Sequence, residues 1–448
     1  MALGVFIYPY ALLGMVSNLE DYAEKLLRIL KDGHILCDTC SGRLFGLRGY
    51  GLSNTDRGRS LKTVLLMRSY KSGGERDEAT VLVLAKTGFQ PAMLLAEKLG
   101  LNAEPRTCTL CRGITGRYRE YAEKAAEAAS RYEFSTFQIG CRVPEEIRRA
   151  EEDLWRLYGL RDAESLKNEA SREIGKIFGE ITGKEYAPER PDMTLIIDLG
   201  SGEVEVEPSP LFICGRYRKL VRGLPQNPWP YDDVEGRIKY KTSIEELITR
   251  PAVEAAEGED AKFHAAGRED IDARMLGRGR PFVVEIRKPR KRSIDLKLLE
   301  KTINERANGL IEVHGLTYCS GDTVKKLKML AEIARKKYRL RVVFKKPLDE
   351  EKLKQLEEIF RDYVVSQRTP TRVLHRRADR VRRKVVYSVK AKKTGEREAE
   401  FEIECQGGFY VKEFIHGDEG RTKPSIAEIL GNEVEEIELD VLDVEETR

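Results

Sequence analysis

The spacing of apolar residues along the chain predicts helices and strands in alternation. In the N-terminal half, apolar residues at helical intervals or a high content of Ala and Glu predict three helices, at residues 18–31, 121–130 and 145–158. Residues 134–143 alternate apolar and polar side chains, as a strand with one buried face does. Residues 193–206 predict a β-hairpin around the turn Gly200-Ser201-Gly202.

Three segments of the N-terminal half are less clearly patterned. The apolar runs 63–68 and 79–85 are compatible with a strand or a buried helix, because their length does not decide between the two. Residues 46–58 are polar and rich in glycine, which predicts a loop.

The C-terminal half predicts a larger sheet. Strands are expected at residues 281–287, 310–315, 339–345, 385–392, 398–405 and 435–444, and helices at residues 295–307, 323–335 and 349–360. This order predicts an α+β fold whose C-terminal domain has a mixed, mainly antiparallel sheet flanked by helices. The segment Pro208-Ser209-Pro210 indicates a boundary between two domains, residues 1–207 and 208–448.

Charge is unevenly distributed in a nearly balanced chain. The 79 basic and 75 acidic residues give a net charge of +4. Residues 274–292 nevertheless hold eight Lys or Arg against Glu285 alone, and residues 368–384 hold eight against Asp379. Either run alone suits a solvated helix face, but two such runs favour a surface that binds a polyanion.

No segment indicates export or membrane insertion. Residues 1–16 are moderately apolar but lack a basic beginning and a cleavage site, and no stretch is long and apolar enough to span a bilayer. We therefore expect a cytoplasmic protein with no membrane partner, in which cysteine thiols stay reduced.

Two C-x-x-C pairs predict a metal site. Cys37 and Cys40 form one pair, and Cys108 and Cys111 form the other. Two such pairs complete a tetrahedral shell of four thiolates, which leaves no position for water and suits a structural zinc ion. A redox role or coincidence is the alternative.

A segment with unusual charge pattern is the candidate for catalysis. Residues 263–286 place Asp270 and Asp272 among arginines, in a loop bracketed by glycines that leads into an apolar strand. Such a loop can hold an ionised carboxylate beside guanidinium groups close to a ligand. A surface loop of salt bridges is the structural alternative.

Several blocks resemble one enzyme family. Gly267-Arg268-Glu269-Asp270 resembles the catalytic motif of pseudouridine synthases. This motif, the C-x-x-C pairs and residues 212–230 and 405–425 together resemble the archaeal and eukaryotic tRNA pseudouridine synthases that modify T-loop uridines 54 and 55. The resemblance covers most of the chain. It implies an N-terminal, zinc-stapled accessory domain with a THUMP-type RNA-binding module, whose latter part fits residues 134–206.

The resemblance also implies the chemistry. Asp270 is expected to be the nucleophile of an isomerisation in which the glycosidic bond breaks, the uracil rotates and its C5 rejoins the ribose. Tyr338 is expected to stack on the target base, and Lys412 to pair with Asp270. The expected substrate-binding residues are Arg268, Tyr338, Tyr410, Val411, Lys412 and Leu439. No cofactor is needed for this chemistry. Core packing is the alternative for the tyrosines and the apolar residues.

Two groups of residues are predicted to bind RNA. The expected RNA partner is the T arm of tRNA, and the enzyme is expected to be a monomer. Basic residues surround a possible stacking face in the first group, which is Arg216, Tyr217, Arg218, Lys219 and Arg222. Arginines at helix-like spacing form the second group, which is Arg372, Arg376, Arg377 and Arg380.

Three other functions are compatible with parts of the sequence. THUMP modules also occur with methyltransferases, but no convincing glycine-rich cofactor loop follows a strand. They occur with ATP-dependent thiolation enzymes, but residues 179–185 are one residue short of a P-loop. The third is a non-catalytic RNA-binding or scaffold protein with a synthase fold. It predicts loss of Asp270, Tyr338 or Lys412, and all three are present.

Overall fold

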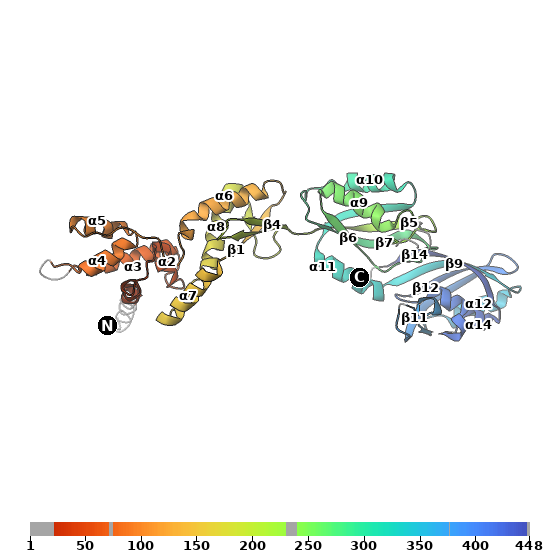
Figure 1. Ribbon diagram of the computed structural model, residues 1–448. Helices are drawn as coiled ribbons and strands as arrows, with labels where there is room; N and C mark the ends of the chain where they lie inside the picture. The colour runs from red at the N-terminus through yellow and green to blue at the C-terminus, as the bar shows by residue number, and fades with distance from the viewer. Residues whose placement is uncertain (1–21, 71–74, 230–239, 376, 446–448) are drawn as a thin grey trace, which may run out of the picture. The chain divides into compact units, whose positions relative to one another are not determined.

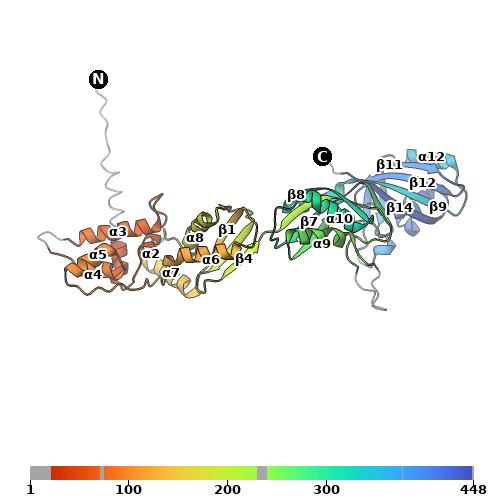
Figure 2. The same cartoon turned by 90° about the horizontal axis from the view of Figure 1, so that it is seen from above.

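The structure is a computed structural model that describes residues 22–70, 75–229, 240–375 and 377–445. It consists of two compact units, Met1–Glu207 and Pro208–Arg448, and each is described here by itself (Figures 1 and 2). The division falls at the residue where the sequence analysis places a domain boundary. Asn18, the expected N-cap of the first helix, lies outside the described residues, and residues 22–31 are helical.

The first unit begins with a helical subdomain. Its further helices are α2 (Asp38–Arg43), α3 (Asn54–Arg68), α4 (Glu78–Lys86) and α5 (Gln90–Lys98). The two ambiguous apolar runs therefore lie in helices, α3 and α4. Ser53 and Asp77 begin these helices, because each side chain accepts a hydrogen bond from a backbone N–H of the first turn.

The predicted loop at residues 46–58 is wrong in its second part, because α3 begins at Asn54. The glycines there serve close helix packing. A Cβ on Gly58 would lie 1.8 Å from the carbonyl oxygen of Asp38, and one on Gly42 would lie 1.7 Å from that of Asn54. Helices α2 and α3 therefore cross with their backbones in contact, which only glycine allows.

The rest of the first unit packs helices on a four-stranded sheet. The elements are η1 (Ile114–Arg117), α6 (Tyr118–Ala129), β1 (Thr136–Arg142), α7 (Glu145–Tyr158), α8 (Leu166–Thr182), β2 (Glu185–Tyr186), β3 (Met193–Asp198) and β4 (Val204–Pro208). The strand order is β2-β1-β3-β4, with β1 parallel to β2 and β3. The predicted hairpin is confirmed, since β3 and β4 are neighbours. Helix α8 was not predicted.

The second unit contains a ten-stranded sheet. Its strands are β5 (Leu211–Lys219), β6 (Asp260–Ala265), β7 (Arg274–Arg287), β8 (Ile311–Cys319), β9 (Arg335–Phe344), β10 (Tyr363–Arg368), β11 (Val381–Lys393), β12 (Glu398–Gln406), β13 (Thr422–Lys423) and β14 (Val434–Val444). The order is β13-β10-β11-β12-β9-β14-β7-β5-β8, with β6 paired to β7. Strands β7 and β14 are parallel, and the other pairs within the described part are antiparallel. The predicted mixed, mainly antiparallel sheet is confirmed.

Helices complete two hydrophobic cores on this sheet. They are α9 (Ile244–Ala256), α10 (Leu296–Ala307), α11 (Gly321–Ile333), α12 (Glu350–Ile359), α13 (Val411–His416) and α14 (Ile426–Leu430), with the short turns η2 (Thr371–Val373) and η3 (Asp418–Gly420). One core joins α9 and α10 to β5, β7 and β8, and the other joins α12, α13 and α14 to β9, β11 and β12 (Figure 1). Strands β7, β14 and β9 connect the two halves, and the catalytic candidates lie at this junction. No helix in the described ranges is long and apolar enough to cross a membrane.

Candidate active site and cysteine cluster

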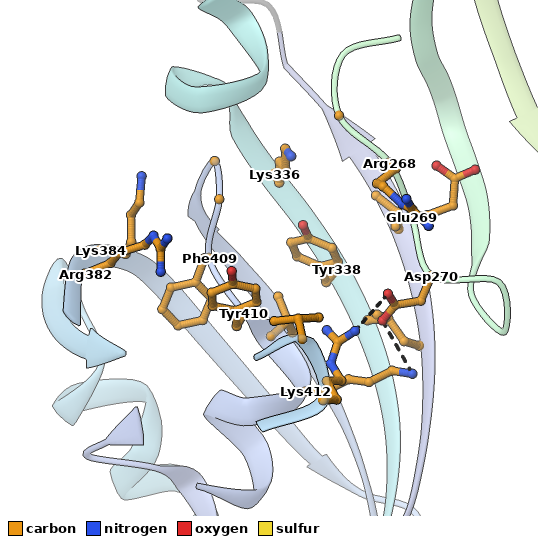
Figure 3. A pocket seen from close by; sticks show the side chains of 18 of the residues that line it. Arg268, Glu269, Asp270, Lys336, Tyr338, Arg382, Lys384, Phe409, Tyr410 and Lys412 are labelled. Atoms are coloured by element: carbon orange, nitrogen blue, oxygen red, sulfur yellow. Dashed lines mark hydrogen bonds and ion pairs between the residues drawn. The ribbon is translucent and has the colours of Figure 1, made fainter. Parts of the chain in front are cut away.

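A cavity of about 750 Å³ lies in the second unit, at the junction of its two cores (Figure 3). Its walls come from β7 and the loop that precedes it, from β9 and β14, from η2 and the segment after it, and from α13 and the segment that leads into it. All seven residues predicted to act in catalysis or substrate binding line it, namely Arg268, Asp270, Tyr338, Tyr410, Val411, Lys412 and Leu439. The structure therefore brings together residues that are up to 171 positions apart in the chain (268 to 439).

The carboxylate of Asp270 is held between two cations and still faces the cavity. Nη1 of Arg372 lies 3.2 Å from its Oδ1, and Nζ of Lys412 lies 3.7 Å from its Oδ2 (Figure 3). About a third of the side chain is exposed, at 34%. The carboxylate is thus fixed in direction and accessible to a ligand, which is the arrangement that a nucleophile needs.

Lys412 is shared between two carboxylates. Its Nζ lies 2.7 Å from Oδ2 of Asp272, which is closer than its distance to Asp270. Burial raises the pKa of Asp272, but the hydrogen bond and the charge of Lys412, together with a backbone hydrogen bond and the charge of Lys219, outweigh this effect, and the pKa lies below its usual value. The expected pairing of Lys412 with Asp270 is present, although it is the longer of the two contacts.

The arginines in and after η2 do not form the predicted helical stripe. Residues 371–373 are a single short turn, and residues 377–380 have no helical conformation. Arg372 points into the site, where Nε donates to Oε1 of Glu413 at 2.6 Å in addition to its contact with Asp270. Arg377 donates to the hydroxyl of Tyr410 at 3.0 Å, and Arg380 is exposed. Arg376 lies outside the described residues.

The prediction that the group around Tyr217 binds RNA is wrong for its central members, because they are buried. Tyr217 and Lys219 are both 0% exposed, so neither can contact RNA in this structure. Lys219 instead donates from Nζ to the backbone oxygens of Asp270 and Ile271, at 3.1 and 2.7 Å. Burial lowers the pKa of Lys219 to about 8. The chain places this ammonium under the loop that carries Asp270.

The remaining basic members of that group also have partners inside the second unit. Arg216 donates to the backbone oxygens of Arg278, Gly279 and Val444. Arg218 pairs with Glu312 at 2.5 Å. Arg222 donates from Nη1 to the backbone oxygens of Asp272 and Leu439, at 2.9 and 2.7 Å. These arginines therefore position strands and the loop that carries Asp270, and the spacing of basic residues alone does not distinguish this role from RNA binding.

Asp440 adds a second anchor behind the cavity. Its carboxylate is 7% exposed and accepts hydrogen bonds from Arg222 at 2.8 Å and from Arg274 at 2.7 Å. Arg339 lies 3.4 Å away. Burial raises the pKa of Asp440, but hydrogen bonds and charges from these arginines outweigh it and lower the pKa below its usual value. This cluster fixes Leu439, which lines the cavity, next to the end of the loop that carries Asp270.

A buried ion pair between Glu269 and Arg280 holds the loop that carries Asp270 against β7. Nε of Arg280 lies 2.8 Å from Oε2 of Glu269, and the two side chains are 2% and 1% exposed. The hydroxyl of Tyr217 donates to the same carboxylate at 3.0 Å. Gln226 bonds both the Tyr217 hydroxyl and the backbone oxygen of Gly267, at 2.8 and 3.0 Å. The motif glutamate is thus a structural partner, which leaves Asp270 as the carboxylate that faces the cavity.

Replacing Arg280 by methionine is expected to lower the free energy of unfolding of the second unit by about 3–5 kcal/mol, because Glu269 would remain buried without its cation. Arg278→Met is the matched control on the same strand. Arg278 pairs with Asp443 at 2.5 Å but is 61% exposed, so its loss should cost at most about 1 kcal/mol. Denaturant unfolding monitored by circular dichroism measures both. Equal effects of the two substitutions would contradict this assignment.

Other residues of the cavity were not predicted. They are Gly267, Glu269, Arg280, Lys336, Val373, Arg382, Arg383, Lys384, Gly407, Gly408, Phe409 and Val441. The expected strand begins at residue 339, whereas β9 begins at Arg335, so the sequence pattern did not indicate that Lys336 and Tyr338 share one face of a strand. The basic residues at 382–384 belong to a run that the charge pattern had singled out.

The four cysteines of the first unit form one cluster. The sulfur atoms of Cys37, Cys40, Cys108 and Cys111 all lie within 4.8 Å of one another. The Cys37 and Cys111 sulfurs are 3.8 Å apart, which matches the separation of about 3.8 Å between thiolates that bind zinc tetrahedrally at about 2.3 Å. Three of the four are buried. The donor set and its geometry fit a metal ion.

A buried arginine connects this cluster to the neighbouring helices. Nη2 of Arg43 lies 3.3 Å from the sulfur of Cys40. The same guanidinium pairs with Glu151 in α7 at 2.5 Å and with Glu169 in α8 at 3.2 Å. The side chain of Arg43 is 0% exposed. Donation to sulfur supports its thiolate form, as outer-shell partners of metal ligands do.

Comparisons with known proteins agree over nearly the whole chain. A family described as "Pus10, C-terminal" matches residues 212–445, and one described as "Pus10 THUMP domain, archaeal" matches residues 121–198. The tRNA pseudouridine synthase Pus10 of Thermofilum pendens is 58% identical over 95% of this chain and 96% of its own. The protein of the same name from Methanopyrus kandleri is 42% identical over 91% of this chain and 95% of its own.

Proposed function

Since the chain belongs to the Pus10 family of tRNA pseudouridine synthases, we propose that Asp270 is the nucleophile of its isomerisation and that the cavity around it receives the target uridine. One observation carries this proposal. Among the three acidic residues of the loop, Asp270 alone lines the cavity with an accessible carboxylate, since Glu269 is buried against Arg280 and Asp272 is not part of the lining. Arg372 and Lys412 orient that carboxylate from two sides.

The cavity also suits the other steps of the reaction. A uridine flipped out of its stack can place its base on the ring of Tyr338, and Val411 and Leu439 supply apolar walls beside it. The carboxylate of Asp270 bonds to the nucleoside as the bond between N1 and C1′ breaks, the uracil turns, and the bond to Asp270 breaks again as C5 forms the new bond to C1′. The C5 proton is lost and N1 gains a proton, so the reaction balances without a co-reactant. An enclosed site holds the detached base for reattachment.

We propose the T arm of tRNA as the substrate region and uridines 54 and 55 as the targets. The THUMP match at residues 121–198 and the basic cavity rim, which includes Arg377, Arg383 and Lys384, support an RNA substrate. The choice of the T loop rests on the family resemblance.

Substitution of the target uridines tests this choice. Unmodified tRNA transcripts labelled with tritium at C5 of uridine release tritium when pseudouridine forms. We expect release from the unaltered transcript and none from one that carries cytidine at both 54 and 55. Undiminished release from the doubly substituted transcript would contradict the T-loop assignment. Tight binding without release from any transcript would support the non-catalytic alternative.

We also propose that the cysteine cluster holds one structural zinc ion. Four thiolates favour zinc over hard cations, and a closed shell of four leaves no position for a substrate or water. Its two pairs come from segments that are 71 residues apart, counted from Cys37 to Cys108, so the ion would join distant parts of the first unit. No step of the isomerisation involves this site.

A further inference from the structure

Lys336 occupies the floor of the cavity next to Tyr338. Both belong to β9, and because side chains alternate along a strand, residues 336 and 338 share one face. Both line the cavity, and Lys336 is only 7% exposed. Figure 3 shows the two side chains on the same strand, with Asp270 on the far side of the Tyr338 ring from Lys336.

The ammonium of Lys336 has no hydrogen-bond or ion-pair partner among the residues that the structure describes. The groups that face it are Arg280 from β7, Lys384 from β11, Cys405 from β12 and Glu269 from the catalytic loop. Glu269 is already bonded to Arg280 and Tyr217. Burial, with repulsion from Arg280, lowers the pKa of Lys336 to about 8. A buried cation without a hydrogen-bond or charge partner raises the free energy of the folded protein, and a bound ligand can supply that partner.

We propose that Lys336 donates a hydrogen bond to a carbonyl oxygen of the target uracil and stabilises the negative charge of the base while it is detached from the ribose. This role rests on the proposed isomerisation at Asp270. When the bond between N1 and C1′ breaks, its electron pair remains with the base and is delocalised onto O2 and O4. A fixed ammonium at the edge of the base stabilises this charge more strongly than it stabilises neutral uridine, which accelerates the step.

The position of Lys336 favours the base over a phosphate as its partner. It shares the face of β9 that carries the proposed stacking residue, so a base on Tyr338 presents an edge to it. Phosphates of an RNA lie farther out, where Arg383 is exposed at the rim of the same cavity. Lys336 is too deeply buried for a contact that only tracks the backbone.

Substitution of Lys336 by methionine and by arginine tests the proposal in the full-length protein. Lys337→Met is the matched control, because Lys337 is the next residue of β9, lies on the opposite face and pairs with Glu402 at 2.6 Å. The probe is the tritium-labelled tRNA transcript. Single-turnover tritium release at saturating enzyme gives the rate, filter binding gives the Kd, and thermal unfolding reports the fold.

We expect Lys336→Met to slow the saturated rate by about 100-fold, with a Kd within about threefold of wild type, because the interaction strengthens only as charge develops. Lys337→Met should leave both within about twofold. A weakened Kd with an unchanged saturated rate would assign Lys336 to a phosphate and overturn the proposal, as would no effect on either. Absence of tritium release from the wild type would instead contradict the proposed function itself.

If Lys336→Met fails to fold, the pH dependence of the rate in the wild type and in Lys336→Arg tests the proposal instead. The rate at subsaturating tRNA reports groups of the free protein. It should fall as the pH rises above about 8, since deprotonation removes the ammonium. Lys336→Arg stays charged, so its profile should lack this fall. Lys219 has a similar pKa of about 8 and is present in both proteins, so a fall that persists in Lys336→Arg would belong to Lys219 and overturn the proposal.

Discussion

Replacing Asp270 by asparagine is expected to lower the rate of pseudouridine formation by at least about 10⁴-fold while the protein stays folded, because the amide is nearly isosteric with the carboxylate but is not a nucleophile. The side chain is 34% exposed, so its exchange removes no buried charge from the core. Arg372 retains Glu413 as a partner, and Lys412 retains Asp272. Single-turnover tritium release from a labelled tRNA transcript measures the rate, and circular dichroism verifies the fold.

Asp272→Asn is the matched control for this result. Asp272 belongs to the same loop and pairs with the same lysine, but it is 65% exposed and does not line the cavity. Its substitution should reduce the rate by no more than about tenfold, through altered positioning of Lys412. The reverse order of effects, with Asp272→Asn inactive and Asp270→Asn active, would transfer the nucleophile to Asp272.

Loss of a ligand from the cysteine cluster is expected to destabilise the first unit strongly. A structural zinc ion in a thiolate site contributes about 10–16 kcal/mol of apparent binding free energy. Cys108→Ser removes one of four ligands and should lower the free energy of unfolding of the first unit by at least about 3 kcal/mol. The packing of Arg43 on Cys40, Glu151 and Glu169 would be weakened with it, since the guanidinium bonds a ligand sulfur.

Metal analysis and hydrogen exchange measure this prediction. We expect about one zinc per chain in the wild type, with faster amide exchange in α2 and α3 after Cys108→Ser or after treatment with a chelator. Cys319→Ser is the control, because Cys319 lies in the second unit and outside the cluster. A wild-type protein that is free of metal and unaffected by chelator would contradict the zinc assignment.

The sequence was sufficient to predict the elements whose patterns are local. Strands that alternate, such as β12 with its regular burial pattern, and helices with a clear apolar stripe, such as α10, lie within a few residues of their predicted ranges. The apolar runs at residues 63–68 and 79–85 could not be assigned, because each run is short and the helix that contains it has no strong periodicity. Strands β5, β6 and β10 were missed, since their character depends on the neighbours with which they pair.

The site residues that belong to family motifs could be predicted from the sequence. The site residues that only the fold directs toward the interior could not. Asp270, Tyr338 and Lys412 were found through family motifs, and they do converge on one cavity. Composition, by contrast, cannot show which arginines and lysines of a basic run face solvent. Lys219 is buried beneath the catalytic loop, although the same run suggested an RNA-binding surface.

Arg372 is a second residue whose orientation could not be predicted from the composition of a basic run. Its spacing from other arginines indicated a phosphate-binding stripe, but the short turn at residues 371–373 directs it toward Asp270. Only the long-range contact, across 102 positions of the chain, reveals that role. Lys336 was overlooked for a related reason, because a lysine in a basic strand carries no motif of its own.

We propose that Asp270 converts uridine to pseudouridine in the T loop of tRNA, and mapping of the product is the decisive measurement. Wild-type protein and Asp270→Asn are incubated with an unmodified tRNA transcript, and pseudouridine is located by carbodiimide modification and primer extension. We expect stops in the T loop with the wild type and none with the variant. Equal stops with both proteins would contradict Asp270 as the nucleophile, and the absence of stops with the wild type, despite tight binding, would contradict the proposed activity.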